Sequence, residues 1–145
     1  MATPWLRARA VSETFISMRP PTGQRKFTSR VVKETISRVK AAIGDPDLAW
    51  MFENCYPNTL DTTIEIGGAT GRPDTFIITG DTDAMGLRDS SCPVWPYVPP
   101  AKNDGDLRGL CQGPIGRKAR STQLDPLCEC PLFRIPSRRN HCFGL

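Results

Sequence analysis

Residues 81–91 hold the set of side chains that is most informative about possible chemistry in this chain. Three carboxylates, one guanidinium and two serine hydroxyls fall within eleven residues, namely Asp81, Asp83, Arg88, Asp89, Ser90 and Ser91. They follow an apolar, β-branched run at 75–79, and polar groups at the end of a strand are often placed to contact ligands.

A carboxylate can accept hydrogen bonds from two adjacent hydroxyl groups, and an arginine donates in a fixed fork. The set therefore suits the recognition of sugar hydroxyls. The residue types equally allow a structural role, in which Asp83 caps a helix and Arg88 pairs with a neighbouring aspartate.

A second polar cluster occupies residues 54–63, with Asn54, Asn58 and Asp61 among threonines. The Tyr-Pro-Asn sequence at 56–58 favours the end of a helix followed by a turn that an asparagine side chain stabilises. This cluster is accordingly expected to be structural.

A third set of side chains lies near the C-terminal end. Cys128, Cys130, His141 and Cys142 supply four groups that bind zinc well, although the Cys-X-Cys spacing is tighter than in most structural zinc sites. Together with nearby arginines, they leave open the alternative of a small zinc-dependent nucleic-acid-binding module. The chain has six cysteines but no recognisable secretory signal, so free thiols are expected.

Helical periodicity predicts two helices in the first part of the chain. Apolar residues at helical spacing predict a helix over 27–43, closed by Gly44. Asp45-Pro46 then predicts the cap and first position of a second helix. The side chains expected on its buried face are Leu48, Met51, Phe52 and Cys55.

Further elements are expected between these helices and the C-terminal part. β-branched residues at 59–66 and 75–79 predict a hairpin or a pair of extended strands. A helix is expected to begin near Asp83 and to be interrupted by prolines. Another is expected over 104–123, weakened by Gly109, Gly113, Pro114 and Gly116.

Composition sets broad limits on the function. The chain has 145 residues, enough for one small domain, and a formal net charge of +4, too small to indicate nucleic-acid binding by itself. Its sequence contains no apolar run long enough to span a membrane. Residues 1–17 are expected to be disordered, and a cytoplasmic location is the default.

Several long blocks of this sequence resemble the N-terminal part of glycoside hydrolase family 125. They are Phe52-Glu-Asn-Cys-Tyr-Pro-Asn-Thr-Leu-Asp-Thr-Thr63, Asp74-Thr-Phe-Ile-Ile-Thr-Gly-Asp81, Asp83-Ala-Met85, Leu87-Arg-Asp-Ser-Ser91 and Val94-Trp-Pro-Tyr97. The resemblance runs from about residue 18 to 126 and is specific, because these blocks occur in the family's order. Residues 18–126 are therefore expected to be the N-terminal part of this domain.

The resemblance implies a mainly α-helical fold, the N-terminal part of an (α/α)₆ toroid with a short hairpin around residues 59–80. It implies an exo-acting, inverting α-mannosidase that removes terminal α-1,6-linked mannose from a glycan and needs no metal or cofactor. The general acid and base are expected beyond this chain, which is therefore expected to be inactive alone. The residues expected to bind substrate are Asp81, Asp83, Arg88, Asp89 and Ser90. A non-catalytic carbohydrate-binding remnant is the other alternative.

The sequence departs from the family pattern at several positions. The family's Asp-Ile-Asp-Ala-Met-Trp-Leu-Arg-Asp-Ser has Thr82 and Gly86 here in place of Ile and Trp, so a flat apolar face is missing. After Pro126 the family continues Tyr-Ala-Asn-Ala, whereas this chain has Leu-Cys-Glu-Cys. One inserted base converts the first string into the second, so residues 127–145 are expected to be an irregular, out-of-frame tail.

Overall fold

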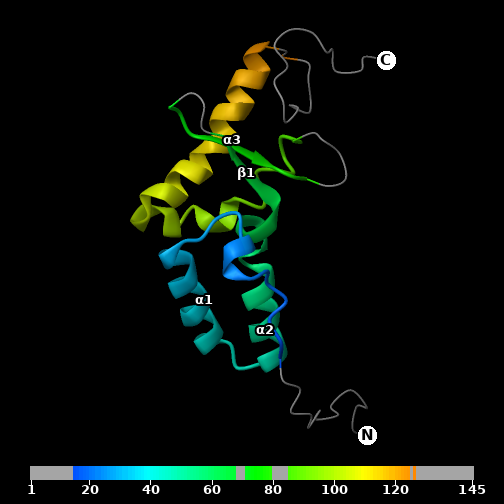
Figure 1. Cartoon of the computed structure of the whole chain (residues 1–145), viewed down its shortest axis with the longest axis vertical. Coiled ribbons are helices and arrows are strands. Elements are labelled where there is room, and N and C mark those ends of the chain that lie inside the picture. Colours follow the sequence, from blue (N-terminus) through cyan, green and yellow to red (C-terminus); the bar gives the residue numbers. More distant parts are fainter. Residues whose placement is uncertain (1–14, 68–70, 80–84, 125, 127–145) are drawn as a thin grey trace, which may run out of the picture.

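The computed structural model describes residues 15–67, 71–79, 85–124 and 126. The described chain is mainly helical and contains one short antiparallel sheet of two strands, β1 and β2, as expected from the sequence. Helices α1 and α2 lie side by side, while the hairpin crosses α3 in another part of the molecule (Figure 1). The helices and strands are α1 (Arg30–Ala42), α2 (Pro46–Cys55), β1 (Ile64–Gly67), β2 (Asp74–Ile77) and α3 (Gly105–Leu124).

Helix α1 begins three residues later than the expected start at residue 27. Ser29 has extended backbone angles, and its hydroxyl accepts a hydrogen bond from the Val32 amide at 3.2 Å, which makes it the N-cap. Val32 and Ile36, two residues of the predicted apolar stripe, are buried. The helix ends at Ala42, just before the expected stop at Gly44.

Helix α2 confirms the predicted start but not the predicted buried face. The Asp45 carboxylate accepts from the amides of residues 47 and 48, and Pro46 occupies the first helical turn. Leu48 and Met51, however, are 55% and 50% exposed, and Cys55 is also exposed. The prediction was wrong for these three side chains because no described element covers that side of α2. Phe52 alone of the predicted set packs against the core.

The predicted hairpin is confirmed, but its first strand begins later than expected. Residues 59–63 form a π-helical turn, η2 (Thr59–Thr63), instead of a strand. The hydroxyls of Thr62 and Thr63 donate to the carbonyl oxygens four residues earlier, bonds that threonine can form within a helical turn and that tend to bend it. Ile64 then pairs with Ile77 across the sheet, and both are fully buried. Gly71, in the connection, has a φ of 64°, which favours glycine.

The helix expected to begin near Asp83 is not found in residues 85–104. Its predicted first residue lies outside the described part of the chain, and residues 87–94 form hydrogen-bonded turns. Two 3₁₀ turns follow, η3 (Trp95–Tyr97) and η4 (Pro100–Asn103). Four prolines in this stretch remove backbone donors, which prevents a continuous α-helix.

Helix α3 confirms the prediction over 104–123 and shows why one of its glycines is needed. Asp104 is the N-cap, since its carboxylate accepts from the Leu107 amide at 3.0 Å. The helix continues through Pro114 to Leu124. A Cβ atom added at Gly113 would lie 2.2 Å from the Thr75 hydroxyl oxygen and 2.5 Å from the Thr75 nitrogen. Gly113 therefore permits the close packing of α3 on β2.

Substitution of Gly113 by alanine is expected to lower the free energy of unfolding by about 1–3 kcal/mol, because the backbone of β2 must move to admit the methyl group. A Cβ atom added at Gly109, on the same helix, would meet nothing within 4 Å. Gly109→Ala is therefore expected to stabilise the protein by about 0.5–1 kcal/mol through helix propensity. Urea unfolding of the two variants measures both effects. Equal stabilities would show that α3 does not depend on this close approach.

The N-caps of α1 and α3 are joined by a hydrogen bond. The Ser29 hydroxyl donates to Oδ2 of Asp104 at 2.6 Å, while Oδ1 of Asp104 caps α3. The bond from the Leu107 amide and the bond from Ser29 lower the pKa of Asp104 from its ordinary value. The two helices therefore start at one shared point.

The core lies between the hairpin, η2, α1 and the first half of α3. Its buried apolar side chains are Val32, Ile36, Leu60, Ile64, Phe76, Ile77, Met85, Val94, Tyr97, Ala101, Leu107 and Leu110. Among the described residues, no helix is long and apolar enough to cross a membrane. Cys55, Cys92 and Cys111 are free thiols.

Candidate functional site

The turn at residues 87–91 presents two of the predicted sugar-binding side chains to solvent. Nε of Arg88 donates to Oδ1 of Asp89 at 2.9 Å, and the two side chains are 88% and 56% exposed. The hydrogen bond and negative charge of Asp89 raise the pKa of Arg88, so the arginine stays charged. The sequence left open whether Arg88 pairs with a neighbouring aspartate, and the structure shows this pair on an accessible surface.

The backbone beside this pair is held in the protein interior. Ser90 is fully buried, and its hydroxyl donates to the Gly86 carbonyl oxygen at 2.6 Å. Met85 is also fully buried, with its sulfur 3.3 Å from the Ile77 amide nitrogen. The contact seen for Ser90 is thus within the turn, and its predicted role in substrate binding stays a prediction.

Gly86 lies directly beside the exposed pair. A Cβ atom there would lie 3.3 Å from Oδ2 of Asp89, a tight contact with the end of a flexible side chain. The absence of a side chain at Gly86 leaves this face of Asp89 open. Asp81 and Asp83, the other two predicted substrate-binding residues, lie outside the described residues.

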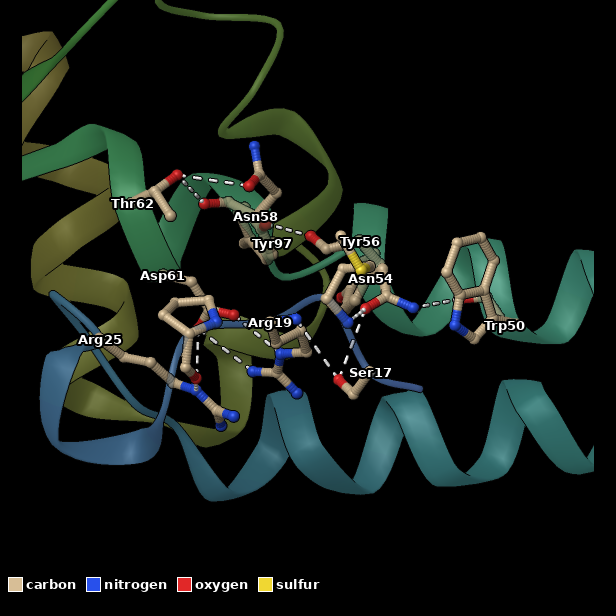
Figure 2. A network of polar contacts seen from close by, with 12 residues as sticks. Ser17, Arg19, Arg25, Trp50, Asn54, Tyr56, Asn58, Asp61, Thr62 and Tyr97 are labelled. Carbon is tan, nitrogen blue, oxygen red and sulfur yellow. Dashed lines mark hydrogen bonds and ion pairs between the residues drawn. The ribbon is translucent and has the colours of Figure 1, made fainter. Parts of the chain in front are cut away.

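A buried ion-pair network joins Asp61 to the N-terminal segment. Nε and one Nη of Arg19 donate to the two oxygens of Asp61 at 2.8 and 3.1 Å, and Nε of Arg25 lies 3.8 Å from Oδ1 (Figure 2). Asp61 is 2% exposed. The amides of residues 26 and 27 also donate to the carbonyl oxygens of residues 61 and 60. Asp61 therefore fixes residues 19–27 against η2.

The neighbouring polar residues extend this attachment. The Asn54 side chain accepts from the Met18 amide at 2.6 Å and donates to the Trp50 carbonyl oxygen at 2.7 Å. The Trp50 indole donates to the Ile16 carbonyl oxygen at 2.8 Å. The Tyr97 hydroxyl donates to the Tyr56 carbonyl oxygen (Figure 2), and burial raises the pKa of Tyr97. The expectation of a structural role for residues 54–63 agrees with these contacts, although the sequence did not identify the arginine partners.

A groove with a volume of about 630 Å³ lies elsewhere on the surface. Side chains of α1, α2 and the proline-rich segment line it, including Arg38, Phe52, Tyr56 and Pro99. Neither Arg88 nor Asp89 is among the residues that line this groove. The described candidate sugar-binding residues and this groove are therefore separate features.

Most of the other described carboxylates already have structural contacts. Asp74 accepts from Arg117 at 2.6 Å and from Arg120 at 2.7 Å, which fixes α3 to β2. The remaining ones with such contacts cap helices or form ion pairs, namely Glu34, Asp45, Glu53, Asp61 and Asp104. No group of three potential metal ligands occurs within the described ranges. The proposed zinc ligands Cys128, Cys130, His141 and Cys142 lie outside them.

Comparison with known proteins relates this arrangement to a family. Residues 45–141 match the family described as metal-independent alpha-mannosidase (GH125). The matched range extends past Pro126 into the segment for which an out-of-frame tail is expected. The domain boundaries at residues 17 and 126, and the nature of the tail, therefore stay predictions.

Two relatives match over most of this chain. The Meiotically up-regulated gene 157 protein of Schizosaccharomyces pombe is 46% identical over 121 residues, which is 83% of this chain and 23% of the relative. A Streptococcus pneumoniae α-mannosidase, solved in a non-productive complex with α-1,6-mannobiose, is similar in structure. Its TM-score is 0.63 at 34% identity, over 72% of this chain and 24% of that one.

The chain thus spans about a quarter of the length of these relatives. The described helices and hairpin correspond to the N-terminal part of the (α/α)₆ toroid that the sequence led us to expect. By its family match and its structural similarity, this chain belongs to glycoside hydrolase family 125, the metal-independent α-mannosidases.

Proposed function

We propose that this chain forms the mannose-recognition part of an exo-acting, inverting α-1,6-mannosidase and does not cleave glycosidic bonds by itself. The observation that carries the proposal is its similarity to a solved α-mannosidase bound to α-1,6-mannobiose, at 34% identity and a TM-score of 0.63. The proposed partner is a mannose-containing glycan. Neither nucleic acid nor a membrane is proposed as a partner.

The exposed turn supports a role in sugar recognition. The pair between Arg88 and Asp89 uses one nitrogen of the guanidinium and one oxygen of the carboxylate. The Nη donors of Arg88 and Oδ2 of Asp89 lie outside that bond. A donor group beside an acceptor group can contact two adjacent hydroxyls of one pyranose ring. Asp81 and Asp83 are proposed to contribute to the same wall of the pocket.

The distribution of carboxylates argues against catalysis by this chain alone. Inversion requires a carboxylic acid that protonates the leaving oxygen and a carboxylate that activates water, about 6.5–9.5 Å apart on opposite sides of the reacting bond. Asp81, Asp83 and Asp89 fall within nine residues of sequence and would line the same side of a sugar. The buried carboxylate of Asp61 is already paired with arginine.

The experiment is to incubate the purified chain with α-1,6-mannobiose, with and without divalent metal, and to measure free mannose. We expect no release above that of an Arg88→Ala variant from the same host. Binding is measured in parallel by NMR saturation transfer, with maltose as a matched disaccharide control. We expect mannobiose and not maltose to bind. Release of mannose would disprove the absence of catalysis, and equal signals from the two sugars would disprove the recognition role.

A further inference from the structure

One lysine of α3 contacts both ends of the exposed turn. Nζ of Lys118 donates to the Leu87 carbonyl oxygen and to the Ser91 hydroxyl, both at 2.5 Å. These acceptors flank Arg88 and Asp89 in the sequence. A single ammonium group therefore joins the residues on either side of the candidate sugar-binding pair.

The turn combines a fixed backbone with exposed side chains. The amide of Ser90 donates to the Gly86 carbonyl oxygen, and those of Ser91 and Cys92 donate to the Arg88 carbonyl oxygen, at 3.0, 3.0 and 3.2 Å. The buried Ser90 side chain adds a further bond to Gly86. By contrast, the Arg88 side chain is 88% exposed. Such a turn presents its charged groups to a ligand with little loss of backbone freedom on binding.

Lys118 connects this turn to a helix that is itself held firmly. Arg117 and Arg120 of α3 both bind Asp74 of β2, and Gly113 packs directly on Thr75. Burial lowers the pKa of Lys118, as expected for an ammonium group that has lost part of its water. Its two protein acceptors replace that water, since an ammonium group has three hydrogens to donate.

We propose that Lys118 is a positioning residue for sugar recognition: it holds the turn so that Arg88 and Asp89 can contact adjacent hydroxyls of a terminal mannose. This inference rests on the proposed function of the same turn. Lys118 acts through the turn backbone and makes no contact of its own with the sugar. A lysine at this position thus contributes to affinity from outside the binding surface.

The test compares Lys118→Met with Lys118→Arg in the full chain. Methionine keeps the apolar stem but removes the donors, whereas a guanidinium can still donate to both oxygens. NMR hydrogen exchange follows the amides of Ser90, Ser91 and Cys92, and α-1,6-mannobiose is titrated against the Arg88 Nε signal. Lys118→Met is expected to speed exchange at these amides and to raise the Kd for mannobiose, each about tenfold. Lys118→Arg is expected to keep the exchange rates and the Kd for mannobiose close to those of the unaltered chain.

Two further variants separate positioning from a general loss of structure. Ser91→Ala removes one of the two acceptors, together with the bond from the Ser91 hydroxyl to the Leu87 carbonyl oxygen, without altering α3, and is expected to raise the Kd about threefold. Lys33→Met makes the same chemical change at an exposed position of α1 and is expected to alter neither readout.

The outcomes distinguish the inference from the function on which it rests. Unchanged mannobiose affinity in Lys118→Met would overturn the role of Lys118, even with faster exchange, because the lysine would then be purely structural. Equal losses in Lys118→Met and Lys118→Arg would overturn it as well. If the unaltered chain binds no mannobiose, the proposed function fails, and the sugar role of Lys118 fails with it.

Discussion

Asp61→Asn is expected to lower the free energy of unfolding by about 3–5 kcal/mol, the usual effect of removing one partner from a buried ion pair. Asp61 is 2% exposed, and Arg19 donates to both of its oxygens. Asparagine keeps the shape of the side chain but leaves the Arg19 guanidinium without its counterion. Arg25, 3.8 Å away, adds a second positive charge. A loss of this size is a large fraction of the stability of a small domain.

Urea unfolding followed by circular dichroism measures this effect. Asp89→Asn provides the matched control, because it also removes the carboxylate of an arginine–aspartate pair, but one whose side chains are 88% and 56% exposed. An exposed pair of this kind contributes little to stability. Similar midpoints for the two variants would contradict the view that Asp61 fixes the N-terminal segment to the core.

Arg88→Ala is expected to raise the Kd for α-1,6-mannobiose by about 10–100-fold. Hydrogen bonds to charged groups are each worth about 1.5–3 kcal/mol, and alanine removes every donor of the guanidinium. The substitution should scarcely alter stability, because the Arg88 side chain is 88% exposed. The expected signature is therefore a large change in affinity with an unchanged unfolding midpoint.

Titration followed by NMR chemical shifts measures the affinity. Arg30→Ala is a suitable control, since Arg30 is an exposed arginine of α1 that also pairs with a carboxylate, that of Glu34. The control should bind mannobiose as the unaltered chain does. An Arg88→Ala variant with normal affinity would remove Arg88 from the proposed site.

The sequence predicted the parts of the fold that local chemistry determines. Asp45-Pro46 starts α2, and Asp104 starts α3, because caps and prolines act on the backbone within a few residues. The β-branched residues predicted the hairpin. Two predictions were wrong: the strand at Thr59–Thr63 and the burial of the outer side of α2. Both depend on which other elements pack nearby, and the spacing of apolar residues along the sequence carries no information about that.

The candidate site was predictable to a similar extent. The turn containing Arg88 and Asp89 was identified from its residue types and its resemblance to a family, and the structure shows both side chains exposed. The supporting contacts of Lys118 and Arg19 reach 31 and 42 residues along the sequence. No local pattern marks such partners, because the same residues would be expected on any solvated helix or loop.

The hydrogen bond between Ser29 and Asp104 has a consequence for the nascent chain. Residue 104 leaves the ribosome 75 residues after residue 29, a delay of roughly 4–15 seconds at ordinary rates of translation. A helix of 13 residues is marginal without tertiary support. During that interval α1 can pack against α2, which follows it directly, but it lacks its contacts with η4. Chaperones that bind apolar segments therefore have several seconds in which to engage α1 before its shared starting point with α3 exists.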